Sequence, residues 1–197
     1  MDARAQELQE WGMVLRQYHL PRWEELPTIQ LYKDQVIALA EEYLSILPGG
    51  EKLLTSAMIN NYVKLRMVPS PVGKRYDRVH LAYLIAISVL KQILTVGEVH
   101  AGIERQTQLS GLRQAYNIFC EELESALRVV SAQAGAGAYI PVLGEEISRE
   151  RLALRMAALS FATKLYTQKI LSMEHPSEQE AAENCPHKKK KSAKEFG

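Results

Sequence analysis

Apolar residues recur at helical spacing along nearly the whole chain, and this periodicity restricts the fold more than any other feature of the sequence. Leu8, Trp11 and Leu15 form one such stripe, and residues 112–130 repeat the spacing. Outside one short turn region at residues 70–78, no segment alternates apolar and polar residues as a half-buried strand would. The sequence therefore predicts an all-α fold.

Capping and turn residues divide this periodicity into separate helices. Residues suited to a helix N-cap begin four of the predicted helices: Asp34, Thr55 or Ser56, Asp77, and Thr95 of a Thr-x-x-Glu capping box. The second of these helices is expected to cover residues 55–67. Gly73 lies in the turn region, which is compact enough for a tight β-hairpin.

The positive charge of the chain is concentrated in one segment. The 197 residues include 24 Lys and Arg and 23 Asp and Glu, a formal net charge of +1. Residues 52–91 contain seven basic residues and one acidic residue, Asp77, which leaves 17 basic and 22 acidic residues elsewhere. A basic segment on an otherwise acidic chain favours a polyanionic partner.

The short helix that follows Thr55 has a polar side of unusual composition. Ile59 lies on the side that can face a core, whereas Asn60, Asn61 and Lys64 project the other way. Asparagine can pair in two places with the edge of adenine in the major groove, and lysine can reach guanine or a phosphate. These residue types suit a DNA recognition helix; a solvated helix face is the alternative interpretation.

The order of these elements resembles the MerR-type winged helix-turn-helix. The resembling segments are TSAMINNYVKLRMVPSP for a recognition helix and its exit, GKRYDR for a basic hairpin wing, and TVGEV for the start of the next helix. In that family the recognition helix lies in the major groove and the wing touches the backbone. The resemblance implies contacts to base edges or adjacent phosphates from Ser56, Asn60, Asn61 and Lys64. It implies contacts to the DNA backbone from Tyr62, Arg66, Lys74, Arg75, Tyr76 and Arg78.

A longer part of the chain resembles a bacterial family known only as domain of unknown function 1836. The segments that carry this resemblance are LPRWEELPTIQLYKDQV, LTSAMINNYVK and KRYDRVHLAYLIAISVLKQIL. That family has no established activity, so the resemblance implies a fold and a bacterial cytoplasmic setting rather than a target. The sequence departs from the MerR pattern by its N-terminal helix and by two C-terminal helical segments in place of one long dimerisation helix.

These observations divide the chain into four regions. Residues 1–33 are expected to form an N-terminal helix and connector, and residues 34–107 a winged helix-turn-helix DNA-binding domain. Residues 108–174 are expected to form a C-terminal helical hairpin that dimerises or senses an effector. The polar residues 175–197 are expected to be a disordered basic tail.

A repeat of apolar residues every three and four positions runs along the predicted C-terminal helix. Such a seam over three heptads favours a homodimer, and packing against residues 112–130 of the same chain is the alternative. The expected dimer interface contains Leu152, Met156, Leu159, Tyr166 and Ile170.

The sequence contains no arrangement typical of catalysis or of a cofactor site. Five histidines are scattered, and Cys120 and Cys185 fit neither a disulfide nor a metal spacing. We therefore expect no catalytic residue, no metal and no cofactor. The N-terminus has no apolar signal core, and the longest apolar run, residues 81–90, is about half as long as a membrane span. These features predict a cytoplasmic protein without a membrane partner.

The leading prediction is a sequence-specific DNA-binding protein, a bacterial transcription regulator whose partner is double-stranded DNA. Helix 55–67 would read the major groove, and wing 70–78 would contact the backbone. The alternative is a protein-interaction adaptor that uses the winged-helix scaffold and the C-terminal helices without binding DNA. A third hypothesis is a sensor of an unidentified small-molecule or protein effector, with a pocket between the helices that contain Leu112 and Leu152.

Overall fold

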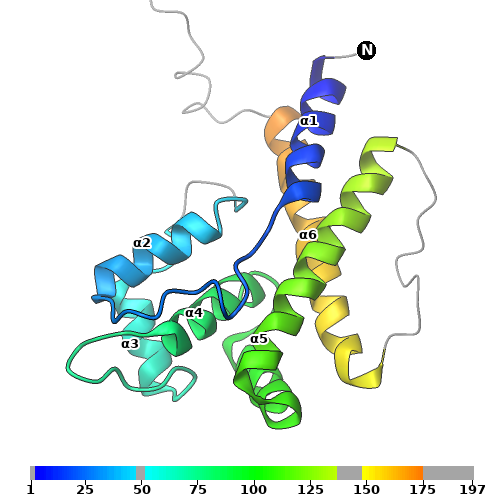
Figure 1. Cartoon of the computed structure of the whole chain (residues 1–197). Helices are drawn as coiled ribbons and strands as arrows, with labels where there is room; N and C mark the ends of the chain where they lie inside the picture. The colour runs from blue at the N-terminus through cyan, green and yellow to red at the C-terminus, as the bar shows by residue number, and fades with distance from the viewer. Residues whose placement is uncertain (1–2, 48–51, 137–147, 175–197) are drawn as a thin grey trace, which may run out of the picture.

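The computed structural model describes residues 3–47, 52–136 and 148–174, and these residues form six α-helices (Figure 1). The helices are α1 (Ala3–Gln17), α2 (Lys33–Tyr43), α3 (Ser56–Lys64), α4 (Arg78–Leu90), α5 (Val96–Ala136) and α6 (Arg149–Glu174). The described residues contain two isolated β-bridges but no strand. The prediction of a predominantly helical fold is confirmed. The predicted basic tail at 175–197 lies outside the described residues, as do residues 137–147 between the two C-terminal helical segments.

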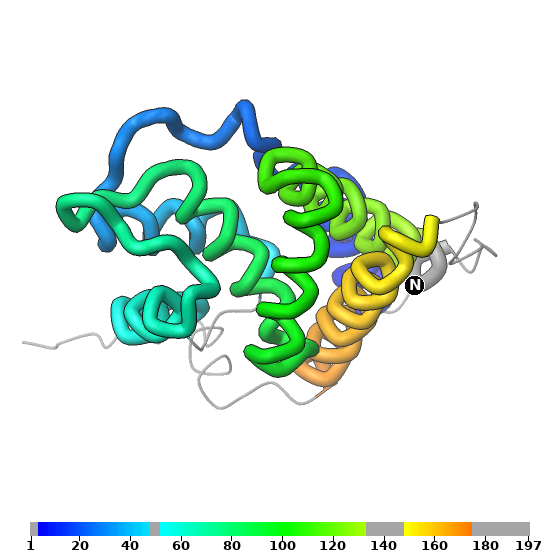
Figure 2. Tube along the Cα trace, turned by 90° about the horizontal axis from the view of Figure 1, so that it is seen from below, coloured from blue at the N-terminus to red at the C-terminus, as the bar shows by residue number. Residues whose placement is uncertain are grey.

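The helices form two groups that share one apolar core. Helices α2, α3 and α4 lie on one side of the molecule, and α1, α6 and the second half of α5 lie on the other (Figure 2). Helix α5 packs against α1, α4 and α6, so it joins the two groups. The core is continuous from Leu31 and Ile59 in the first group to Phe161 in the second. No helix in the described part of the chain is long and apolar enough to cross a membrane.

Three of the predicted helix starts are capped as expected. The Thr55 hydroxyl accepts a hydrogen bond of 3.2 Å from the Met58 amide at the start of α3. The Asp77 carboxylate accepts hydrogen bonds of 3.0 and 3.3 Å from two amides in the first turn of α4. Before α5, the Thr95 amide donates to the Glu98 carboxylate at 2.8 Å, and the Glu98 amide donates to the Thr95 hydroxyl at 3.3 Å. These side chains satisfy amide donors that helix geometry leaves without a partner.

Two predicted helix limits are wrong. The N-cap of α2 is Tyr32 rather than Asp34, which lies in the first turn of the helix. The Gln35 side chain replaces the expected cap by accepting a hydrogen bond of 2.8 Å from the Tyr32 amide. Helix α3 ends at Lys64, three residues before the predicted end, because Arg66 adopts a left-handed conformation with φ of 59°.

Helix α5 consists of two helical arms that meet at Gly111. The φ and ψ angles of Gly111 are 75° and 156°, a combination that is essentially restricted to glycine. The kink separates the segment that begins after Thr95 from the segment at residues 112–130, as the sequence predicted. Both arms are therefore positioned by one backbone conformation.

The predicted β-hairpin wing is a tight turn without a strand on either side. The Arg75 amide donates a hydrogen bond of 2.9 Å to the Val72 carbonyl. Between them, Gly73 and Lys74 both have positive φ, 57° and 62°, as in the two central residues of a type I′ turn. A second bridge, between Leu31 and Tyr76, attaches the end of the turn to the segment that precedes α2.

Candidate nucleic-acid interface

Helix α3 has a buried apolar side and an exposed polar side. Ile59 and Tyr62 are buried in the core. The four residues predicted to face base edges or nearby phosphates are all exposed: Ser56, Asn60, Asn61 and Lys64. The helical spacing of the sequence therefore identified the solvent-facing side of α3 correctly.

An open hollow lies beside this exposed side of α3, where three segments meet. The segments are the N-terminal end of α2, α3 itself and the turn at residues 72–75. The hollow has a volume of about 600 Å³, and its lining includes Tyr32, Lys33, Asp34, Asn60, Val63 and Lys74. Because Asn60 and Lys74 line the same hollow, the polar side of α3 and the basic turn lie on the same side of the molecule.

Lys33 fixes the orientation of Asn60 inside this hollow. Its ammonium group donates a hydrogen bond of 2.6 Å to Oδ1 of Asn60. The amide nitrogen of Asn60 is left to act as a donor toward an incoming group. Sequence reasoning missed Lys33, since no local pattern pairs a residue at the start of α2 with one on α3.

Arg75 attaches the turn to the N-terminal end of α2. Its guanidinium carbon lies 3.6 Å from the centre of the Tyr32 ring, and its Nη2 donates a hydrogen bond of 2.6 Å to the Tyr32 hydroxyl. A cation stacked on an aromatic face is attracted by the ring quadrupole. Tyr32 remains half exposed and adds an aromatic surface beside the hollow that the sequence did not suggest.

Three residues predicted to contact the DNA backbone are turned into the protein instead. Tyr62 and Tyr76 are core residues, 4% and 2% exposed, and burial raises the pKa of both hydroxyl groups. Arg78 donates a hydrogen bond of 2.9 Å to the Leu26 carbonyl, and its guanidinium lies 5.7 Å from the centre of the Trp23 ring. We therefore remove Tyr62, Tyr76 and Arg78 from the candidate interface.

The remaining basic residues keep their charge at the surface. Arg66 and Lys74 are exposed, and each adopts a left-handed backbone conformation itself. Asp77, the one acidic residue between positions 52 and 91, caps α4 with its carboxylate. Among the described residues, Asp34 is the one acidic residue in the lining of the hollow. The candidate interface therefore carries several positive charges around the single carboxylate of Asp34.

The predicted dimer seam on α6 is divided between the core and the surface. Leu159 and Tyr166 are buried in their own chain, and the Tyr166 ring packs edge-on against Trp11 with 4.9 Å between centroids. These two residues therefore pack within their own chain, and we remove them from the predicted dimer interface. Leu152, Met156 and Ile170 are about 40% exposed and stay available to a partner.

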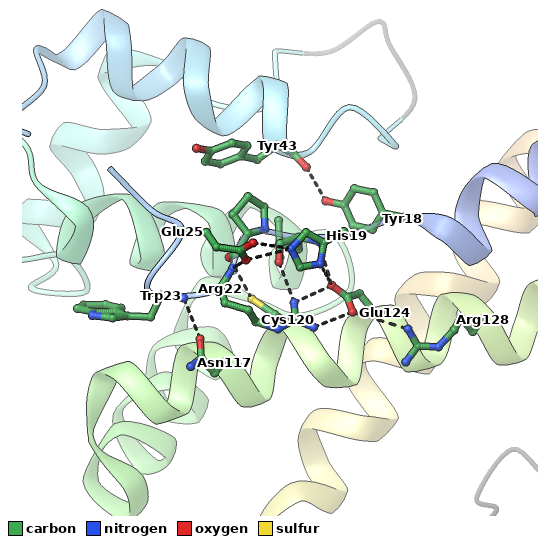
Figure 3. Close-up of polar contacts among 12 residues, drawn as sticks. Tyr18, His19, Arg22, Trp23, Glu25, Tyr43, Asn117, Cys120, Glu124 and Arg128 are labelled. Atoms are coloured by element: carbon green, nitrogen blue, oxygen red, sulfur yellow. Dashed lines mark hydrogen bonds and ion pairs between the residues drawn. The ribbon is translucent and has the colours of Figure 1, made fainter. Parts of the chain in front are cut away.

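A polar cluster attaches the connector between α1 and α2 to helix α5 (Figure 3). The two Nη atoms of Arg22 donate hydrogen bonds of 2.6 and 2.7 Å to the Glu124 carboxylate, and the Leu20 amide donates a third of 2.9 Å. Burial opposes ionisation of Glu124, but these hydrogen bonds outweigh it and lower the pKa of the carboxyl. In the same cluster, burial raises the pKa of the Cys120 thiol to about 12, so this cysteine is unreactive at neutral pH. The cluster is a structural joint that holds the α2–α4 group against α5.

A protein-family model described as Domain of unknown function (DUF1836) matches residues 21–119, about half of the chain. The matched region begins in the connector, includes α2, α3 and α4, and ends in the second arm of α5. No curated protein and no solved structure matches. Every residue of the candidate interface lies inside the matched region.

Proposed function

We propose that this chain, which belongs to the family described as Domain of unknown function (DUF1836), binds double-stranded DNA as a MerR-like winged helix-turn-helix protein. Helix α3 would enter the major groove, and the turn at residues 72–75 would lie along the backbone as a short wing. The proposal depends on one observation, the hollow that Asn60 of α3 shares with Lys74 of the turn. A helix and a basic turn on the same side can contact a groove and its flanking phosphates together.

The exposed side of α3 suits contact with base edges. Asn61 makes no side-chain hydrogen bond within the described residues, so both groups of its amide can pair with an adenine edge. Asn60, with its oxygen held by Lys33, presents its amide nitrogen to acceptors such as N7 of a purine or O4 of thymine. The small exposed Ala57 on the same side permits close approach to the groove.

The basic residues around α3 suit contact with phosphates. Ser56 lies at the N-terminal end of α3, where free amides and the helix dipole favour an anion. Lys64, Arg66 and Lys74 are exposed, and Arg75 is held in place by Tyr32. Each phosphate that such residues neutralise releases counterions from DNA, so affinity should fall steeply as salt rises.

The biological role that we propose is that of a cytoplasmic bacterial transcription regulator. A small DNA-reading unit gains affinity and specificity when two copies bind two half-sites. The exposed residues Leu152, Met156 and Ile170 of α6 are the candidates for the homodimer contact.

Fluorescence anisotropy of a labelled, randomised duplex pool at several salt concentrations tests DNA binding directly. We expect saturable binding whose logarithmic affinity falls linearly with the logarithm of salt concentration. Absence of salt-sensitive binding to any duplex would overturn the proposal. It would favour the adaptor hypothesis if a protein partner bound through α6 and tolerated substitution of Lys74.

A further inference from the structure

An open cavity of about 400 Å³ lies between α4, the two arms of α5 and α6. None of the residues in its lining belongs to α2, to α3 or to the turn at 72–75. The cavity is therefore separate from the candidate DNA interface, and an inference about it does not depend on DNA binding.

The cavity exists because several facing positions on the three helices carry small side chains. Ala82 and Ala86 lie one helical turn apart on α4, and Ala153 and Ala157 lie one turn apart on α6. Large side chains normally fill the space between packed helices to the density of an organic crystal. Gly102 of α5 also lines the cavity, and a Cβ atom there would meet no atom within 4 Å. These small residues thus leave space that no side chain of the described chain fills.

The lining of the cavity is apolar and partly aromatic. Tyr83 of α4 and Tyr116 and Phe119 of α5 contribute aromatic rings, and Leu94 and Leu112 contribute aliphatic side chains. An unfilled apolar cavity forfeits dispersion contacts and reduces stability in proportion to its volume. Small-molecule sites are typically apolar hollows of about 300–1,000 Å³ that contain a few polar groups. The cavity agrees with this description in its volume of about 400 Å³ and in its mainly apolar lining.

The polar groups of the lining indicate what kind of group an apolar ligand would carry. Arg105 and Gln106 both line the cavity, and Arg105 makes no ion pair within the described residues. Oε2 of Glu98 accepts two hydrogen bonds of 2.8 Å from Thr95, which hold this carboxylate at the start of α5. Among the described residues, Glu150 is the other acidic residue in the lining. The available side-chain donors of Arg105 and Gln106 favour an acceptor, and a carboxylate suits a guanidinium best.

We propose that this cavity binds a small organic acid, with its apolar body between α4, α5 and α6 and its carboxylate at Arg105. The site is the sensor pocket that the sequence placed between the helices containing Leu112 and Leu152, extended to include α4. Both Leu112 and α4 residues line it, whereas Leu152 itself does not.

Displacement of the fluorescent apolar dye N-phenyl-1-naphthylamine tests the proposal with three competitors that share one apolar body. The competitors are decanoate, 1-decanol and decylamine, used below the concentrations at which they form micelles. We expect saturable binding of one dye per chain, displaced most strongly by decanoate and least by decylamine. A ranking with decylamine first would overturn the assignment of the carboxylate, since it would indicate that Glu150 determines the preference.

Cavity-filling variants test the location of the site. Ala86→Phe on α4 and Ala157→Phe on α6 place a ring in the hollow and should weaken dye binding at least tenfold. The matched control is Ala101→Phe, because Ala101 is exposed on α5 and does not line the cavity. Circular dichroism and the unfolding midpoint identify a variant that has lost its fold. Unchanged dye binding in a folded filling variant would overturn the proposal.

Arg105→Gln keeps the proposal testable even where a filling variant fails to fold, because Arg105 is exposed. This substitution should weaken decanoate about tenfold and leave 1-decanol unchanged. Arg113→Gln, another exposed position on α5 outside the cavity, is the control and should alter neither. Dye binding that disappears as the chain self-associates would instead assign the apolar hollow to a second copy and overturn the ligand proposal.

Discussion

Lys33 donates a 2.6 Å hydrogen bond to Oδ1 of Asn60, a residue 27 positions further along the chain. The contact joins the N-terminal end of α2 to the exposed side of α3. It fixes one half of an asparagine amide and leaves the other half toward solvent. In the proposed complex, Lys33 is therefore a positioning residue for the base contact of Asn60, in addition to carrying a positive charge near the groove.

Asn60→Ala should alter the preferred DNA sequence at one base pair by about 1–3 kcal/mol, because a side-chain contact to a base edge is lost. Lys33→Met should relax the preference at the same base pair while retaining the side-chain stem. The double variant should lose less than the sum of the two single losses, with a coupling of about 0.5 kcal/mol or more. Competition binding with single-base-pair variants of the selected duplex measures the base-pair preference of the wild-type chain, of each single variant and of the double variant. Strict additivity would contradict the positioning role.

Lys74→Gly should weaken binding to every duplex alike. It should also make the plot of log affinity against log salt concentration less steep, by the amount expected for about one lost phosphate contact. Glycine is chosen because Lys74 has a φ of 62°, a conformation that glycine adopts without strain, so the turn itself should be kept. The control is Arg149→Ala, which removes an exposed charge at the start of α6. Anisotropy titrations over a salt series measure the slope. An unchanged slope for Lys74→Gly would remove the turn from the interface.

Arg22→Ala should lower the free energy of unfolding by up to about 3 kcal/mol, because it leaves the buried Glu124 carboxylate without its bidentate partner. The partial exposure of Arg22 keeps the loss below that of a fully buried pair. The control is Arg113→Ala, which removes an exposed ion pair with Glu24 and should cost at most about 1 kcal/mol. Urea unfolding at neutral pH measures both, and equal losses would contradict the role of the cluster as a structural joint.

The same cluster predicts how stability depends on pH. The pKa of Glu124 in the folded chain is below the ordinary carboxyl value of 4.5, so the unfolded chain binds its proton more tightly. The stabilisation from Glu124 is therefore complete above about pH 4.5 and is lost as the pH falls through the folded pKa. Glu124→Gln should flatten this part of the curve of unfolding free energy against pH. A curve that keeps its shape in Glu124→Gln would assign the acid sensitivity to other groups.

Gly111→Ala should destabilise the chain by about 1–3 kcal/mol, because the φ of 75° and ψ of 156° at the kink of α5 are strained for any residue with a Cβ. Steric crowding adds nothing, since a Cβ at Gly111 would meet no atom within 4 Å. Gly97→Ala, in the first turn of the same helix and in equally open space, should be neutral or stabilising. Thermal unfolding of the two variants compares them, and equal midpoints would contradict the strain argument.

The features that the sequence predicted correctly are those set by neighbouring residues. Thr55, Asp77 and the Thr95–Glu98 pair cap helices because each side chain reaches amides two or three residues away. The exposed side of α3 follows from its helical spacing in the same way. The sequence also distinguished the helical segment after Thr95 from the one at residues 112–130, although it did not identify Gly111 as the residue where they meet. Such local signals need no knowledge of which helices meet.

The features that the sequence could not supply depend on contacts between distant segments. Tyr62 and Tyr76 are amphipathic side chains at the edge of a pattern, and only the tertiary packing of the core decides that they are buried. Arg78 turns inward because Trp23 and the Leu26 carbonyl, both more than 50 positions away, provide partners. On α6, the regular spacing identified an apolar side without indicating whether Leu159 meets its own chain or a second copy.

Selection from a randomised duplex pool, performed in parallel with the wild-type chain and with Asn60→Ala, tests whether the polar side of α3 reads DNA. We expect the wild-type chain to enrich a defined sequence and the variant to enrich the same sequence with one altered or degenerate base pair. A palindromic motif would in addition support the proposed homodimer. Enrichment of no sequence by the folded wild-type chain, or of an identical sequence by both proteins, would contradict the claim that the polar side of α3 reads DNA.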